Sequence, residues 1–169
     1  TEKLIDNYSF TGASLAQAEI TNHRLIYVSP TLSKDIHISG TSKVTVMLSS
    51  SKSAANLTVW LVSLPWTKGR KTKITDNIIT RGWADPQNHQ SITKSEPLIP
   101  GKFYKVSFDL MPDDQIISKG QQIGLMIFSS DKEFTLHPEP GTELTINLDA
   151  TTITIPIIGG PEEFNTAIK

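Results

Sequence analysis

The feature that most constrains the fold of this chain is its content of β-branched side chains. The 169 residues include 20 isoleucines, 6 valines and 19 threonines, just over a quarter of the sequence. These side chains have restricted χ1 rotamers and fit a pleated sheet better than a helix. The composition therefore indicates an all-β domain, and it excludes a coiled coil, a helical bundle, a collagen and a disordered chain. The length predicts one domain with short tails.

Nine short segments have the pattern of strands. Residues 43–49 alternate with a period of two, with Val44, Val46 and Leu48 on one face, as expected for a half-buried strand. Residues 56–64 form a continuous apolar run, which predicts a central strand covered on both faces. The other predicted strands cover residues 24–29, 35–39, 74–83, 103–110, 122–129, 143–148 and 152–158. Many short strands separated by turn signals favour a sandwich or a barrel.

The segments at the two ends of the chain differ from this strand pattern. We expect a lead-in from an upstream domain over residues 1–22, a sandwich over residues 23–160 and a tail over residues 161–169. Residues 13–19 of the lead-in could form one or two turns of helix. Within the sandwich, residues 112–120 predict one short helical turn, because Pro112 is near the start and Gly120 is at the end. The proline at position 156 predicts a sheet-edge position for the last strand.

Charge and cysteine content narrow the function classes. The chain has 16 Lys and Arg against 17 Asp and Glu, a net charge of −1, and lacks the basic excess that is typical of nucleic-acid binding. No apolar run approaches the ~20 residues that a membrane helix needs. With no cysteine, a disulfide scaffold and a thiolate site are excluded. The chain starts at Thr1 rather than at a methionine, which suggests a fragment of a longer protein.

Catalytic and metal-binding patterns are weak. The sequence contains no Gly-x-Ser-x-Gly motif, and its four histidines form no ligand pair, so we predict no catalytic residue, metal or cofactor. Asp109, Asp113 and Asp114 could offer oxygen ligands to calcium, but calcium needs six or more, and the last two fit the first turn of a short helix. The basic run over residues 68–73 is interpreted as a solvated hairpin loop rather than a nucleic-acid site.

The most distinctive stretch covers residues 81–89. In an antiparallel sandwich, successive connections alternate between the two ends, so the loop after Trp83 and the loop over residues 130–142 are expected at one end. A contact surface there could include Asp85, His89, Asp131, Glu133 and His137. Unrelated solvated side chains are the simpler alternative. The candidate interface residues from this reasoning are Trp66, Trp83, Asp85, Asn88 and His89.

Several strings resemble one known family. The string Arg24-Leu25-Ile26-Tyr27-Val28-Ser29-Pro30 and the string Gly82-Trp83-Ala84-Asp85-Pro86-Gln87-Asn88 resemble the C-terminal domain of X-prolyl dipeptidyl-peptidases. The related cocaine-esterase and acylase hydrolases share the more general landmarks. The resemblance runs from about His23 to Leu148, and it also includes Pro97-Leu98-Ile99-Pro100-Gly101, Phe108-Asp109-Leu110-Met111-Pro112-Asp113-Asp114, Lys119-Gly120 and Gly141-Thr142-Glu143-Leu144-Thr145.

This resemblance implies a jelly-roll β-sandwich, similar to galactose-binding domains, behind an α/β-hydrolase domain. The family's enzymes are serine peptidases that release X-Pro dipeptides from peptide N-termini, typically as cytoplasmic homodimers. Their Ser, Asp and His lie in the hydrolase domain, so the resemblance implies a non-catalytic chain that packs on that domain and shapes substrate access. The alternative is a free-standing carbohydrate- or surface-binding module, for which Trp66 and Trp83 could supply the aromatic rings.

Overall fold

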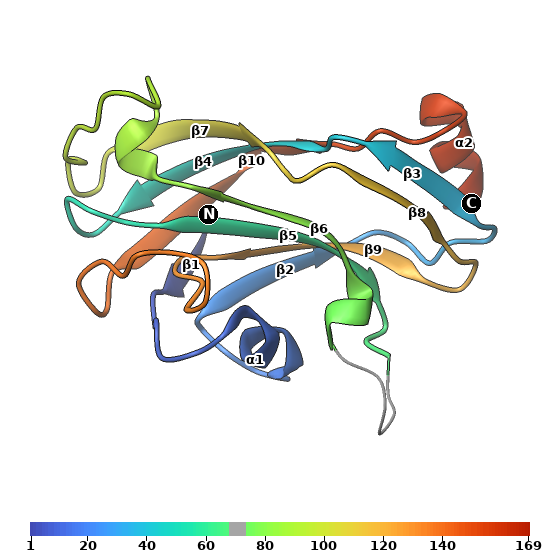
Figure 1. Cartoon of the computed structure of the whole chain (residues 1–169), viewed down its shortest axis with the longest axis horizontal. Coiled ribbons are helices and arrows are strands. Elements are labelled where there is room, and N and C mark those ends of the chain that lie inside the picture. Colours follow the sequence, from blue (N-terminus) through green and yellow to red (C-terminus); the bar gives the residue numbers. More distant parts are fainter. Residues whose placement is uncertain (68–73) are drawn as a thin grey trace.

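The computed structural model describes residues 1–67 and 74–169 and shows a sandwich of two four-stranded antiparallel sheets (Figure 1). The first sheet has the order β1-β10-β4-β7, formed by Glu2–Ile5, Glu143–Thr154, Lys43–Ser50 and Phe103–Asp109. The second has the order β2-β9-β5-β6, formed by Arg24–Val28, Gln122–Phe128, Leu57–Leu64 and Ile78–Ala84. A two-stranded ribbon consists of β3 (Ile36–Gly40) and β8 (Asp113–Ile117). The described part also contains helices α1 (Gly12–Gln17) and α2 (Gly160–Ala167) and 3₁₀ turns η1 (Ile74–Asn77) and η2 (Pro86–Asn88). The prediction of an all-β sandwich is confirmed.

The main core lies between the two sheets and follows the predicted alternation. Val44, Val46 and Leu48 of β4 are fully buried and point toward the second sheet. All eight residues of β5 are buried, as predicted for a central strand covered on both faces. Apolar side chains on both faces of β5 are removed from water. One face packs in the main core against the first sheet, and the other packs in the smaller cluster with Leu15 and Ala16.

The outer face of the second sheet is covered by α1 (Figure 1). The Thr11 hydroxyl caps the helix by accepting a hydrogen bond from Ser14 N at 3.1 Å. Leu15 then packs into a smaller apolar cluster with the Trp60 ring of β5. At the other end of α1, the Arg24 guanidinium donates to two backbone carbonyls, at 2.6 and 2.5 Å. Residues 12–17 of the predicted lead-in are therefore an integral layer of the sandwich, and the predicted helical turn there is confirmed.

The helical turn predicted over residues 112–120 is wrong, since residues 113–117 form strand β8. Ile117 is 1% exposed and lies opposite Ile36 of β3, whereas Ile116 points outward. Two consecutive isoleucines suit an extended backbone, and β3 supplies the ladder of hydrogen bonds that a lone segment lacks. The helical interpretation of Asp113 and Asp114 fails with it, because both are strand residues.

The ends of the chain are more structured than predicted. Residues 2–5 form the edge strand β1, with Leu4 opposite Leu144. The predicted tail contains most of α2, and Ala167 is fully buried. Gly159 has a φ of 87° and immediately precedes the helix, whose first turn contains Pro161. The Gly-Gly-Pro sequence therefore begins a helix as well as ending the strand region.

The two predicted strands over residues 143–148 and 152–158 are replaced by one strand, β10, which ends at Thr154. Its pairing with β4 is irregular between Asn147 and Thr152. Beyond its end, Ile157 makes an isolated bridge with Ile38. On its other side, β1 pairs only with residues 143–146. The second half of β10 therefore has no strand partner on that side among the described residues.

Candidate functional site

The connections over residues 51–56, 85–102 and 129–142 meet at one end of the sandwich, on the left in Figure 1. We call this end the loop end. The predicted proximity of the loop after Trp83 and the loop over residues 130–142 is confirmed there. The indole Nε1 of Trp83 donates a hydrogen bond to Asp131 Oδ2 at 3.2 Å. The expected alternation of connections therefore gave the correct end for these two loops, although β8 adds a strand that the count did not include.

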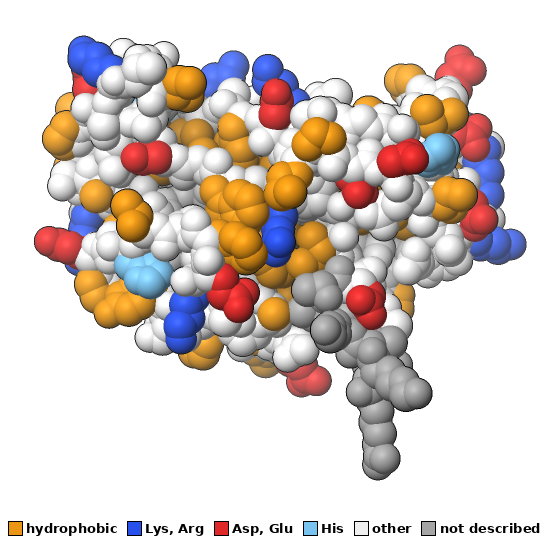
Figure 2. Space-filling model, viewed as in Figure 1, with side chains coloured by type: hydrophobic (Ala, Val, Ile, Leu, Met, Phe, Trp, Pro, Cys, Tyr) orange, Lys and Arg blue, Asp and Glu red, His pale blue; other side chains and the backbone are white. Residues whose placement is uncertain are grey.

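Three side chains form a compact stack beside this hydrogen bond, and we call them the Arg81–Trp83–Phe134 cluster. The Trp83 and Phe134 rings stack with centroids 5.0 Å apart and planes 28° apart. The Arg81 guanidinium carbon lies 4.3 Å from the Phe134 centroid and 5.5 Å from the Trp83 centroid. Figure 2 shows hydrophobic side chains gathered around one basic side chain over β6. Phe134 is 50% exposed, so the cluster offers aromatic and cationic surface of the kind that dominates binding interfaces.

Asp131 supports the cluster by accepting the hydrogen bond from Trp83. Its side chain is fully buried, and its Oδ1 atom has no hydrogen-bond partner within the described structure. Burial raises the pKa of this carboxyl above its usual value, and the hydrogen bond from Trp83 opposes the rise. Its backbone carbonyl accepts bonds from the N–H groups of Phe134 and Thr135, both at 2.9 Å. The residue therefore closes the tight turn that presents Phe134.

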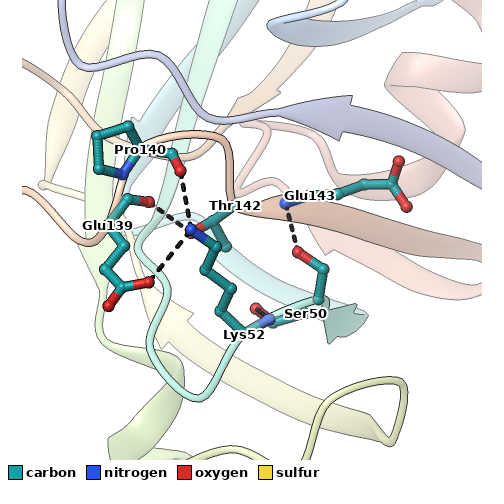
Figure 3. Close-up of polar contacts among 7 residues, drawn as sticks. Ser50, Lys52, Glu139, Pro140, Thr142 and Glu143 are labelled. Carbon is teal, nitrogen blue, oxygen red and sulfur yellow. Dashed lines mark hydrogen bonds and ion pairs between the residues drawn. The ribbon is translucent and has the colours of Figure 1, made fainter.

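A second set of contacts fixes the same loop to the turn after β4 (Figure 3). Lys52 Nζ donates to the Pro140 carbonyl at 2.9 Å and pairs with Glu139 Oε2 at 3.2 Å. The Thr142 hydroxyl donates to the Glu139 carbonyl at 2.8 Å. Glu143 N donates to Ser51 Oγ at 2.9 Å. These bonds hold residues 139–143 at the loop end.

Three of the predicted interface residues have local structural roles. Asp85 Oδ1 accepts from Gln87 N at 2.9 Å and so caps η2. The His89 ring meets the Tyr104 ring edge-on at 4.6 Å, and its Nδ1 lies 3.1 Å from the Pro86 carbonyl. Asn88 is the last residue of η2, and its buried Oδ1 has no partner within the described structure. These residues shape the loop that flanks the cluster.

Trp66 lies at the opposite end of the second sheet from Trp83. It follows β5 and packs against the cluster of α1 and Trp60. Trp83 pairs with Thr58 near the start of β5, six residues before Leu64. At about 3.3 Å per strand residue, the two ends of that span are about 20 Å apart. The five predicted residues therefore do not form a single site.

The two histidines predicted at the loop end are separate from each other. His137 stacks on Tyr8 with centroids 4.8 Å apart, whereas His89 contacts Tyr104. Within residues 1–67 and 74–169, no three His, Cys, Asp or Glu side chains form a group that could hold a metal ion. Asp114 instead lies 2.6 Å from His37 Nε2, and this hydrogen bond lowers the pKa of the carboxyl. The basic run over residues 68–73 lies outside the described residues.

Sequence reasoning missed Arg81 and Phe134 as site residues. Arg81 is two residues before Trp83 on one strand, so period-two alternation places both on the same face, and this signal was available. Phe134 is distant in sequence and reaches Trp83 only because the loop folds back over β6. Its position depends on the buried turn at Asp131.

Fold and site together define an all-β sandwich domain, in which the polar side chains of the loop end organise loops and present an aromatic surface. Solved structures share this fold. An α-amino acid ester hydrolase matches with a TM-score of 0.72 at 14% identity, over 92% of this chain and 32% of that chain. A CocE/NonD family hydrolase from Staphylococcus aureus matches with a TM-score of 0.57 at 12% identity, over 92% and 36%.

The chain belongs to the family described as the X-Pro dipeptidyl-peptidase C-terminal non-catalytic domain, whose family model matches residues 1–166. A Rhodopirellula baltica protein with the provisional name Xaa-Pro dipeptidyl-peptidase is 61% identical over 160 residues, which are 95% of this chain and 26% of that protein. A Bacillus cereus protein of the same provisional name is 40% identical, over 84% of this chain and 23% of its own length. The chain thus spans about a quarter of the length of these relatives. Its two helices are short, and none of the described residues forms a helix able to cross a membrane.

Proposed function

We propose that this chain is the C-terminal part of a serine peptidase that releases X-Pro dipeptides, and that it packs on the α/β-hydrolase domain and shapes substrate access. One observation carries the proposal. The family match covers residues 1–166, yet the chain spans only 26% of its 61%-identical relative. In this proposal, the Ser, Asp and His of the reaction lie in the larger remaining part. The enzyme is cytoplasmic, acts on peptides and forms a homodimer.

The Arg81–Trp83–Phe134 cluster is the proposed centre of the interdomain contact. Tryptophan, tyrosine and arginine are the residue types that most often dominate interface energies. Phe134 is 50% exposed and Leu136 is 90% exposed, so both have apolar surface left to bury. The stack and the Lys52 contacts hold this surface in place, which lowers the entropic cost of docking.

The carbohydrate-binding alternative has less support. A sugar site built from Trp66 and Trp83 needs both rings on one ligand, but the strand geometry separates them by about 20 Å. Trp66 is also packed against the α1 cluster. This spacing favours the interdomain role over a sugar site built from these two rings.

The experiment supplies the hydrolase part and this chain as two separate polypeptides. We expect association in analytical ultracentrifugation and recovery of X-Pro p-nitroanilide cleavage, with no cleavage by this chain alone. Trp83→Ala should weaken association by about tenfold or more, consistent with loss of an interface anchor worth over ~1.4 kcal/mol. Trp66→Ala is the matched control and should leave association unchanged. Absence of association, together with oligosaccharide binding by this chain, would support the alternative.

A further inference from the structure

The first sheet is incomplete along one edge. Strand β1 pairs with β10 from Glu2 opposite Ile146 to Ile5 opposite Glu143. Beyond this point, β10 continues to Thr154, and on its other side it pairs with β4 at Asn147 and again from Thr152 to Thr154. Among the described residues, no strand covers the β1 side of residues 147–154. An uncovered strand edge with apolar neighbours is a template for another strand.

The uncovered edge opens directly onto the core. A groove of about 200 Å³ lies between the two sheets here, lined by Tyr27, Leu125, Leu148, Thr151, Thr152 and Ile153. Leu148 and Ile153 pack against the main core but remain partly exposed. An adjoining groove of about 410 Å³ continues to α2, with Ile155, Ile157 and Phe164 among its lining residues. The sandwich therefore leaves a strip of core side chains without a cover.

The direction of β1 indicates what covers this strip. Because the two strands are antiparallel, the chain before Glu2 runs along β10 from Asn147 toward Thr154. On its other side, the five residues from Met47 to Lys43 of β4 span β10 from Asn147 to Thr154, because β10 is irregular between Asn147 and Thr152. About five preceding residues therefore reach the end of β10. The family is a C-terminal domain, and the relatives are about four times as long as this chain. We propose that residues preceding Thr1 in the complete protein extend β1 along the free edge of β10 and fill the groove beside Leu148.

The register specifies which preceding side chains enter the groove. Leu4 is fully buried, and the Glu2 carboxylate reaches across the opening to accept a bond from the Tyr27 hydroxyl at 2.9 Å. Alternation with a period of two then turns the residue immediately before Thr1 inward, opposite Leu148. We expect that residue to be apolar. This inference rests on the proposed function, since it requires a preceding polypeptide.

Hydrogen exchange in the unmodified complete protein gives the first test. Amides of residues 147–154 on the β1 side should exchange about tenfold or more slowly in the complete protein than in the 169-residue chain, because a paired amide must open before it exchanges. The outer edge of β7 is the internal control and should not change. Equal exchange along β10 in the two proteins would overturn the extension. Protection that depends on concentration in the 169-residue chain would overturn it in favour of a second copy.

A cross-link tests the register. The chain has no cysteine, so Leu148→Cys can be combined with a cysteine substituted for the residue before Thr1. Directly opposite strand residues lie within disulfide distance, so we expect a bond on mild oxidation. Lys105→Cys on β7 is the control partner and should form none, because β10 and β4 separate the two positions. If no bond forms with Leu148→Cys while the separate polypeptides still associate, the strand extension is wrong and the proposed function stands.

Discussion

Phe134→Ala tests whether the Arg81–Trp83–Phe134 cluster is a stabilising unit of the isolated chain. The substitution removes a ring whose centroid lies 5.0 Å from the Trp83 centroid and 4.3 Å from the Arg81 guanidinium carbon. Stacking contributes ~0.5–1.5 kcal/mol and an exposed cation–π contact ~0.5–1 kcal/mol. Half of the ring is already in water, so the burial term is about half of the ~2–3 kcal/mol of a fully buried ring. Because these terms overlap, we expect a loss of about 2 kcal/mol.

The assay is urea unfolding followed by tryptophan fluorescence, with thermal unfolding as a second measurement. A loss of about 2 kcal/mol corresponds to a fall of about 4–8 °C in Tm for a domain of this size. Phe103→Ala is the matched control, because Phe103 is 41% exposed on β7 and no ring contact with it is found in the described structure. It should cost about 1 kcal/mol less, since only the burial term is lost. Equal losses in the two variants would refute the reasoning that the stack stabilises the loop.

Three further changes test other parts of the structure. Gly12→Ala should cost ~1–3 kcal/mol in urea unfolding, because a Cβ atom there would lie 2.2 Å from the Trp60 ring and must displace α1; unchanged stability would contradict the close packing. Asp131→Asn tests whether the raised pKa of Asp131 makes the stability of the chain depend on pH. A carboxyl whose pKa is raised on folding contributes stability that is present below its ordinary pKa and is lost as the pH rises through the folded value. The free energy of unfolding of the variant should therefore rise relative to that of the original chain as the pH rises from 3 to 7. A difference that does not change with pH would refute the raised pKa. Lys52→Met should lower the free energy of unfolding by less than ~1 kcal/mol, because the ion pair with Glu139 is solvent-accessible. A larger loss would contradict this assignment of a weak surface contact.

The sequence by itself determined the elements whose identity is set by local alternation. Residues 43–49 and 103–110 have apolar side chains at every second position, and the structure places β4 and β7 there. The continuous apolar run over residues 56–64 identified the central strand, because both faces of such a strand are covered. In these segments the pleat of one strand decides which side chains are buried, so no knowledge of a distant partner is needed.

Tertiary structure alone decided the elements that depend on a partner far along the chain. Residues 113–117 are a strand because β3 is beside them to complete their hydrogen bonds. Residues 160–167 are a helix because Ala167 finds a buried place and its carbonyl accepts from Ser33 N at 2.6 Å. Phe134 meets Trp83 only after the loop has folded over β6, and Trp66 is separated from Trp83 by the length of β5. Contacts of this kind are not encoded in any local period, because they arise from the order in which strands join the sheets.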